Sequence, residues 1–519
     1  MKANKIDPAK IDKLFTSIEN ILKEMVSELN KEKWKNFFLP LCFYKIINKI
    51  SENQNEVLNN WEIDERYNWN HIVECAQKNQ KNIGEIVDNA LYNIEVHNKE
   101  NLNNANFSKG FKITFENFEP NLNKIILEIE NSKIFNPIFE FDKKNYNFDI
   151  LAHIYEKFLK KFGKFEKLSA GKFYTPVSVV KLMANILFFY FKTNTTKKLN
   201  KKELNIYDPT VGSGGMFIQS LNLFNQLNFS KNFYGQEKDS DDCQFARMNL
   251  SLYDIFFDLQ AGDTILSPSK SFPDKMDIIL SNPPFNSKKT DEYKNIPNIN
   301  GEKIESKYNL ARDNSLNFYF MCHIIEKLNK NGKAAILLDE NTSTSKSSSL
   351  IRKAIIEKDL IHIIIKLPRR IFANTNINVL LYILNKNKGV TKNKILFINA
   401  EEERKTKGNQ VYLGKENIQN IMNIVNDFLN NKIEKCAIYE KSNVATIEDI
   451  AKEDYDLKIE KYVHIKPEEK IDDEKYIQIK TQICKDIDEV NTKLNLLRNK
   501  FNEIKDLEKL MNEINSQDN

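Results

Sequence analysis

Residues 204–217 read Leu-Asn-Ile-Tyr-Asp-Pro-Thr-Val-Gly-Ser-Gly-Gly-Met-Phe, and this stretch decides the fold. The apolar run around Ile206 and Tyr207 predicts a strand, and the sequence from Gly215 onward predicts a helix. Three of the chain's 14 glycines fall within four positions between them. Glycine there permits positive φ and lets a ligand approach the backbone, while the helix N-terminus offers free N–H groups. A tight turn that binds no ligand is the alternative interpretation.

The glycine spacing fits neither the GxxxxGK[ST] pattern of a phosphate-binding loop nor the GxGxxG pattern of a dinucleotide site. Outward from this stretch, short β-rich runs alternate with helical runs between residues 146 and 400. This alternation predicts an α/β fold, with a mostly parallel sheet and helices on both of its faces. The neighbouring runs 360–368 and 378–386 could instead pair antiparallel. Sheets of this kind bind ligands at the carboxyl ends of their strands.

The segments on either side of this middle part have a different character. Apolar residues repeat at helical spacing over residues 11–25 and 34–50, and all three tryptophans lie in this part of the chain. We therefore predict an N-terminal helical domain over residues 1–145. From residue 401 to residue 519 the chain is charged and loses the strand–helix alternation. This change of pattern predicts a separate C-terminal region.

A heptad repeat lies near the end of the chain. Apolar residues between Ile483 and Ile514 step by four and three residues alternately, with one break at Glu508. Such a repeat is typical of coiled coils and of long paired helices. Residues 471–516 are therefore predicted to form either an intramolecular helix hairpin or helices that dock on a partner subunit.

Composition indicates the cellular compartment of the protein but says little about any reaction that it catalyses. The 519 residues include 77 Lys and Arg against 72 Asp and Glu, and the net charge of +5 permits nucleic-acid contact without demanding it. Six cysteines stand singly, which argues against zinc ribbons, iron–sulfur clusters and disulfide frameworks and favours a reducing compartment. We see no signal peptide and no apolar run long enough to span a membrane, so we expect a cytoplasmic protein.

Carboxylates follow two further predicted strands. Glu237 ends the second strand, the position at which such sheets bind the hydroxyl pair of a ribose. Asp263 follows the third strand and could accept a hydrogen bond from an adenine amino group. Each residue by itself has a plain alternative, because Glu237 could be a solvated surface acid and Asp263 a turn residue.

The most specific motif is Asn282-Pro283-Pro284-Phe285, which ends the apolar run Met276–Leu280. Two prolines restrict the backbone, so the Asn282 side chain and the Pro283 carbonyl are held as two fixed acceptors. Two such acceptors can bind both protons of an exocyclic amine, whose lone pair is otherwise delocalised into its ring. They thereby stabilise the positive charge that develops on nitrogen during attack. Phe285 would stack on the base, and a simple loop is the alternative.

These motifs resemble those of N6-adenine DNA methyltransferases, and specifically the modification subunits of type I restriction–modification systems. Residues 171–176, Gly-Lys-Phe-Tyr-Thr-Pro, resemble the family's segment that binds the methionine end of S-adenosylmethionine. Residues 371–377, Ile-Phe-Ala-Asn-Thr-Asn-Ile, resemble the family's Asn-Thr-Gly-Ile loop near the target base. Asn376 replaces the usual glycine there, and asparagine tolerates positive φ, so the loop shape is expected to survive.

The resemblance implies a Rossmann-like methyltransferase sheet over residues 146–400 and S-adenosylmethionine as cofactor, with no metal. It implies that residues of the Asn-Pro-Pro-Phe motif are catalytic, and that Phe285 and Phe372 contact the target adenine. The catalytic residues are then Asn282, Pro283, Pro284 and Phe285. The cofactor-binding residues are then Lys172, Phe173, Tyr174, Thr175, Pro176, Val177, Asp208, Gly212, Ser213, Gly214, Gly215, Glu237 and Asp263.

The resemblance also implies partners: double-stranded DNA, a specificity subunit that selects the methylated sequence, a second modification subunit and a restriction subunit. Two other functions share some of these features. A protein glutamine N5-methyltransferase uses a similar motif, but the helical leader and the heptad repeat argue against it. A catalytically inactive DNA-binding scaffold would keep the fold, but the retained motifs argue against decay. The cluster Lys366, Arg369 and Arg370 could contact phosphate or form a solvated loop.

Overall fold

The computed structural model divides the chain into two compact units, Met1–His464 and Ile465–Asn519. The residues that it describes are 34–52, 61–99, 119–132, 175–198, 203–253, 255–285, 287–294, 304–310, 315–372, 377–408, 410–463 and 473–515, together with Thr16, Leu102 and Ile296. Within these ranges, none of the helices combines the length and the hydropathy that a membrane span requires.

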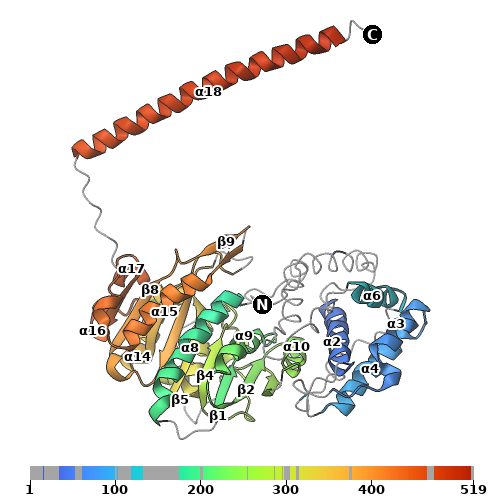
Figure 1. Ribbon diagram of the computed structural model, residues 1–519. Helices are drawn as coiled ribbons and strands as arrows, with labels where there is room; N and C mark the ends of the chain where they lie inside the picture. The colour runs from blue at the N-terminus through green and yellow to red at the C-terminus, as the bar shows by residue number, and fades with distance from the viewer. Residues whose placement is uncertain are drawn as a thin grey trace. The chain divides into compact units, whose positions relative to one another are not determined.

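A nine-stranded sheet forms the centre of the first unit, in the order β11-β8-β6-β7-β5-β4-β1-β2-β3 (Figure 1). Its strands are β1 (Glu203–Asp208), β2 (Ser230–Glu237), β3 (Phe256–Ala261), β4 (Met276–Ser281), β5 (Leu328–Asp339), β6 (Ile361–Lys366), β7 (Val379–Asn385), β8 (Lys394–Asn399) and β11 (Ser442–Thr446). Strands β1 to β5 pair in parallel, whereas β7 runs antiparallel to both β5 and β6. The predicted α/β fold is confirmed, as is the antiparallel pair of β6 and β7.

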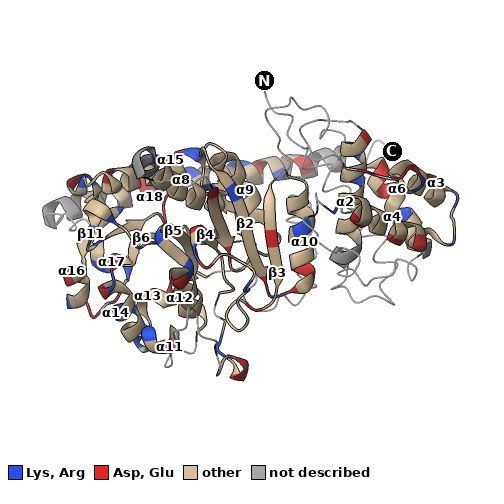
Figure 2. Cartoon of the chain, turned by 90° about the horizontal axis from the view of Figure 1, so that it is seen from below, with Lys and Arg blue, Asp and Glu red and all other residues tan. Residues whose placement is uncertain are grey.

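Helices cover both faces of this sheet (Figures 1 and 2). On one face lie α8 (Val177–Lys198), α9 (Gly215–Phe224) and α15 (Lys415–Leu429); on the other lie α12 (Asn317–Lys327), α14 (Ser349–Glu357), α16 (Ile447–Lys452) and α17 (Ile459–Tyr462). Side chains alternate between the faces along each strand, so Ile363 and Ile365 belong to one core and Ile364 to the other. The central strands are apolar on both faces because both are covered.

The N-terminal part is helical, as predicted, and has its own apolar core. Its described helices are α2 (Trp34–Glu52), α3 (Trp69–Gln77), α4 (Ile83–His97) and α6 (Glu119–Asn131). Helix α10 (Ser240–Ser251) joins this core to the sheet, because Phe245 and Met248 pack in the helical core while Ala246 and Leu250 pack in the sheet core. Of the helix predicted over residues 11–25, only Thr16 lies within the described residues.

The short elements complete the chain order. They are η2 (Glu65–Tyr67), η5 (Asp291–Lys294), α11 (Ile304–Lys307), α13 (Asn341–Thr344), η7 (Lys346–Ser348), η8 (Gly389–Thr391), β9 (Lys405–Lys407), β10 (Gln410–Tyr412) and η9 (Ile433–Cys436). Strands β9 and β10 pair antiparallel as a small separate hairpin.

The predicted domain boundary at residue 400 lies too early. Strand β11 pairs antiparallel with β8, and helices α15 to α17 pack on the sheet. The compact unit therefore continues to His464, because these later elements cover apolar surface that β6 and β8 would otherwise expose. Strand β11 has only five residues, Ser-Asn-Val-Ala-Thr, and therefore gives a weak strand signal in the sequence.

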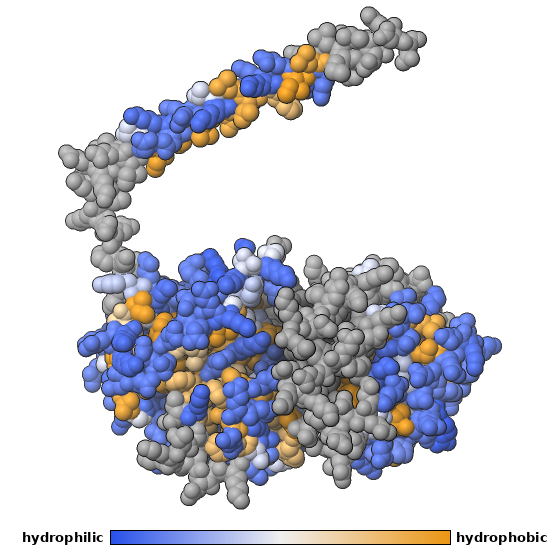
Figure 3. Space-filling view, in the orientation of Figure 1, coloured by the Kyte–Doolittle hydropathy of each residue, from blue (hydrophilic) through white to orange (hydrophobic). Residues whose placement is uncertain are grey.

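The second unit contains one continuous helix, α18 (Asp473–Asn515). A hairpin is therefore not formed within residues 473–515. Figure 3 shows hydrophobic residues following one another along α18. The apolar heptad side chains are exposed by 45% or more, namely Ile483, Ile487, Val490, Leu494, Leu497, Phe501 and Ile504.

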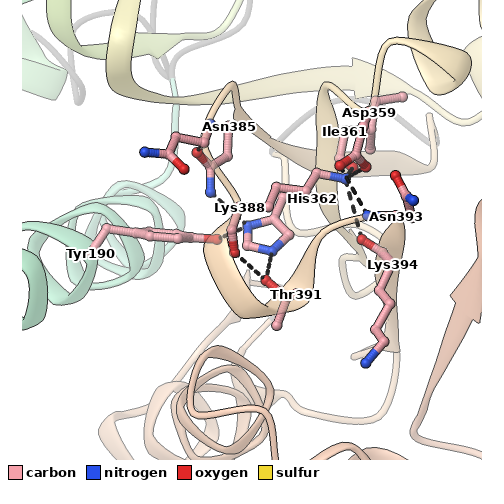
Figure 4. Close-up of polar contacts among 10 residues, drawn as sticks. Tyr190, Asp359, Ile361, His362, Asn385, Lys388, Thr391, Asn393 and Lys394 are labelled. Carbon is pink, nitrogen blue, oxygen red and sulfur yellow. Dashed lines mark hydrogen bonds and ion pairs between the residues drawn. The ribbon is translucent and has the colours of Figure 1, made fainter.

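The amino-terminal end of β6 carries a buried polar network (Figure 4). Tyr190 Oη lies 2.6 Å from His362 Nδ1, to which Asn385 Nδ2 lies 3.1 Å, and His362 Nε2 lies 2.7 Å from Thr391 Oγ1. Thr391 in turn donates to the carbonyl of Lys388. Burial, together with nearby lysine charges, lowers the pKa of His362 well below its usual value. The neutral ring thus ties α8, β6 and β7 together at the end of the sheet opposite to the carboxyl ends of the parallel strands.

Candidate active site

Two predicted motifs meet at the carboxyl edge of the sheet. Strand β1 lies between β4 and β2, so the glycine turn that follows β1 is next to the Asn-Pro-Pro-Phe motif that follows β4. Thr210 links them directly, since its backbone N–H donates to Asp208 at 2.9 Å and its hydroxyl lies 3.4 Å from the Ser281 hydroxyl. Parallel strands place their carboxyl ends side by side, and the sequence prediction depended on this geometry.

The glycine turn needs glycine at two positions for its backbone. Gly212 has φ of 53° and Gly214 has φ of 78°, a region that other residues rarely adopt. Gly214 is the N-cap of α9, and a side chain there would also approach Leu250 of α10 to 3.3 Å. The turn is fixed from outside because Asn249 Nδ2 donates to the Ser213 carbonyl at 2.8 Å. There is open space beside the partly exposed Gly212, where an added Cβ would meet nothing within 4 Å.

Glu237 at the end of β2 faces this turn. Its two carboxylate oxygens accept hydrogen bonds from the backbone N–H groups of Gly212 and Asp239, each at 3.0 Å. Asp239 in turn caps α10. The carboxylate is thus held at the strand end in one orientation. The ribose role of Glu237 remains a prediction.

Asp208 at the end of β1 is completely buried. Its Oδ1 accepts from Thr210, whereas its Oδ2 has no hydrogen-bond partner among the described residues. Burial, with the nearby charge of Glu237, raises the pKa of Asp208 to about 8. A buried carboxyl without a partner for one oxygen fits a ligand that brings a cation or a hydrogen-bond donor, and S-adenosylmethionine carries both.

Asp263 lies at the third strand end but is already engaged. Its Oδ1 accepts from the N–H groups of Ile265 and Leu266, at 2.9 and 3.1 Å. Its Oδ2 accepts from the Tyr293 hydroxyl at 2.6 Å and pairs with Lys238 Nζ at 3.1 Å. A carboxylate has about four acceptor positions, and these contacts occupy them. The predicted contact of Asp263 with an adenine amino group would therefore displace one of these donors.

The Asn-Pro-Pro-Phe motif contacts two segments far away in sequence. Asn282 Nδ2 donates to Thr175 Oγ1 at 2.8 Å, which joins the motif to the residues just before α8. The Phe285 and Phe372 rings meet edge to face with centroids 5.3 Å apart, and both are buried. The structure thus brings together four predicted residues from three parts of the chain. Predicted residues Lys172, Phe173 and Tyr174, and the loop residues 373–376, lie outside the described residues.

A family model described as N-6 DNA Methylase matches residues 146–471, well over half of the chain. The chain belongs to the N-6 DNA methylase family. The type I restriction enzyme MjaIX methylase subunit of Methanocaldococcus jannaschii is 29% identical over 449 residues, covering 84% of this chain and 75% of that protein. The HindI methylase subunit of Haemophilus influenzae is 33% identical over 261 residues, covering 49% of this chain and 55% of that protein.

A solved structure shows the same fold. The type I restriction–modification methyltransferase subunit from Streptococcus thermophilus superposes with a TM-score of 0.66 at 22% identity, covering 87% of this chain and 99% of that one. This N-6 DNA methylase therefore has the fold of type I methyltransferase subunits, including a helical N-terminal region.

Two features of this N-6 DNA methylase were not predicted or were predicted wrongly. Tyr293 and Lys238, which bind Asp263, carry no sequence signal beyond their positions after the motif and after β2. Lys366 was predicted as a possible phosphate contact, but it is 4% exposed and lies within 3.4 Å of Glu340, Glu401 and Glu460. A lysine enclosed by three carboxylates cannot reach DNA phosphate. The three carboxylates come from distant parts of the chain, so only the tertiary structure shows that they surround Lys366.

Proposed function

We propose that this protein is the modification subunit of a type I restriction–modification system and transfers a methyl group to N6 of adenine in DNA. One observation carries the proposal: the glycine turn and the Asn-Pro-Pro-Phe motif lie at neighbouring strand ends, joined through Thr210. The family membership and the names of the curated relatives support it.

The cofactor of the proposed reaction is S-adenosylmethionine, which when bound supplies a methyl group on a sulfonium sulfur. Glu237 would bind its ribose hydroxyls, and the open space beside Gly212 would allow the cofactor to approach the turn closely. Asp208 would face its positively charged part, because a cation stabilises the ionised form of a buried carboxyl. Thr175 and the first residues of α8 would contact the methionine end of S-adenosylmethionine.

The target adenine has to leave the DNA stack, because its N6 cannot be reached in line inside a duplex. The Asn282 side-chain oxygen and the Pro283 carbonyl would accept the two amino protons. The hydrogen bond from Asn282 Nδ2 to Thr175 fixes which end of the carboxamide is the acceptor. These oxygens stabilise the positive charge that develops on nitrogen as it attacks the methyl carbon. Phe285 and Phe372 would provide the aromatic wall for the base.

The proposed partners rest on the curated relatives, which are type I restriction enzyme methylase subunits, and on the exposed apolar row of α18. A specificity subunit would choose the DNA sequence, and we propose that the exposed heptad row of α18 docks on it. The complete assembly would contain double-stranded DNA, a second modification subunit and a restriction subunit.

Replacing Asn282 tests the proposed reaction. Asn282→Ala, purified with the specificity subunit, should lose about 100-fold or more in transfer of labelled methyl groups to DNA, because a transition-state acceptor worth roughly 3 kcal/mol is removed. Binding of S-adenosylmethionine, measured by calorimetry, should change little. Normal N6-methyladenine formation by this variant would reject the assignment.

The same assay separates the two alternatives. A protein glutamine N5-methyltransferase would transfer label to protein and leave DNA unlabelled. An inactive scaffold would label neither and would fail to bind S-adenosylmethionine in the calorimeter. Digestion of the labelled DNA and mass spectrometry of its nucleosides would identify the modified atom as N6 of adenine, or show another product.

A further inference from the structure

One glutamate bridges the start and the end of the connection between β6 and β7. Glu340, directly after β5, has one carboxylate oxygen 3.3 Å from Nζ of Lys366, the last residue of β6. Its other oxygen accepts from Nδ2 of Asn378, just before β7, at 2.8 Å. The Glu340 backbone N–H also donates to the Asn378 carbonyl at 2.9 Å. The two ends of the connection that carries Phe372 are therefore fastened to the same residue.

Lys366 is the fixed point at the first end. Only 5% of its side chain is exposed, and besides Glu340 it pairs with Glu460 at 2.6 Å and Glu401 at 3.4 Å. Burial opposes its charge, but the hydrogen bond to Glu460 and the surrounding carboxylates outweigh this and raise its pKa. A buried lysine is tolerated only where such partners surround it, so its position is closely determined.

Residues 367–372 connect Lys366 to Phe372, one of the two aromatic rings assigned to the target base. The Leu367 N–H donates to the Val379 carbonyl at 3.1 Å, and Arg369 contacts Glu401. Arg370 then adopts φ of 58°, a left-handed conformation that is costly for a residue with a side chain. Such a conformation persists only where its surroundings hold it. Two residues later, Phe372 meets Phe285 of the catalytic motif.

We propose that Glu340 is a positioning residue for methyl transfer: by binding both Lys366 and Asn378 it holds Phe372 against Phe285, the two rings that the proposed function assigns to the target base. The inference rests on the proposed function and deepens it, because Glu340 would touch neither cofactor nor base. It would act only through the shape of the wall. Loss of the Glu340 contacts should therefore lower the rate of methyl transfer to the flipped base and leave the affinity for the cofactor unchanged.

The test compares variants that remove the hydrogen bond between Glu340 and Asn378 from either residue. Glu340→Ala and Asn378→Ala, each in complex with the specificity subunit, are assayed on DNA carrying the site mapped with the wild type. We expect each to lower kcat at least tenfold, with the affinity for S-adenosylmethionine unchanged. The double variant should be no worse than the poorer single variant, because both cut one connection. With 2-aminopurine as the target base, the fluorescence increase on flipping should be smaller in both variants.

Glu460→Gln is the matched control. It removes one carboxylate charge from Lys366 but leaves the Asn378 tie, so we expect less than a threefold loss of kcat. Equal kcat of Glu340→Ala, Asn378→Ala and the wild type, or losses that multiply in the double variant, would overturn the inference. If Glu340→Ala does not fold, as thermal unfolding would show, Asn378→Ala decides the outcome. Absence of DNA methylation by the wild type would instead reject the proposed function.

Discussion

Asp208 is a carboxyl group placed where water does not reach it. In the unfolded chain it titrates at its ordinary value near pH 4. In the folded protein burial and the charge of Glu237 raise its pKa to about 8, so the folded state keeps the proton to higher pH. The free energy of unfolding that this group contributes is therefore complete below about pH 4 and is lost as the pH rises toward 8.

Asp208→Asn removes this titration while keeping nearly the same shape. We expect wild type and variant to have similar stability near pH 4 without cofactor. Above that, the variant should become the more stable, by a few kcal/mol at about pH 8, and the gap should then level off. Urea unfolding at several pH values measures this difference. A gap that does not change with pH would contradict the raised pKa of Asp208.

At the scale of elements, η5 controls what Asp263 can bind. The Tyr293 hydroxyl on η5 and Lys238 after β2 occupy one oxygen of Asp263, while the turn N–H groups of Ile265 and Leu266 occupy the other. An adenine amino group can reach this carboxylate only if a donor gives way. Under the proposed function, the position of η5 would set how strongly Asp263 binds the amino group of the cofactor.

Tyr293→Phe removes one of these donors. We expect S-adenosylhomocysteine to bind several-fold more tightly relative to S-inosylhomocysteine, whose ring lacks the amino group, because an acceptor position on Asp263 becomes available. Calorimetry gives the two dissociation constants in each protein. Asp263→Asn serves as control and should lose the preference. An unchanged ratio in Tyr293→Phe would show that Asp263 does not recognise the amino group.

At the scale of the whole molecule, the chain consists of a compact unit that ends at His464 and a helix with an uncovered apolar row. A row of large apolar side chains exposed along one helix is typical of a surface that packs against another helix. Cutting the chain after Asp472 removes this helix and leaves every described element of the compact unit. The truncated protein should keep its thermal unfolding temperature within a few degrees and should lose co-purification with the specificity subunit.

A point variant in the row makes the same prediction in the full chain. Leu494→Asp places a charge among the heptad side chains, whereas Asn495→Asp places the same charge one position away, outside the heptad row. Pull-down should show loss of the specificity subunit with Leu494→Asp and retention with Asn495→Asp. Retained binding by both the truncated chain and Leu494→Asp would place the docking surface elsewhere.

The sequence by itself determined the fold class and which motifs meet at one edge of the sheet. Alternating strand and helix signals specify a parallel sheet, and parallel strands bring their carboxyl ends to one edge. The glycine turn, Glu237 and the Asn-Pro-Pro-Phe motif therefore had to meet once each was read as following a strand. The sequence also predicts the heptad row, because a 3.5-residue period is a local property of the sequence.

Only the tertiary structure decided which groups near that edge are engaged and which are not. Lys366, Glu340 and Asn378 come from three different elements, and their contacts follow from the packing of β5, β6 and β7. The extension of the sheet beyond residue 400 through β11 and the engagement of Asp263 by Tyr293 depend in the same way on distant residues. Local patterns carry no information about such partners, because burial and pairing are set by contacts far away in sequence.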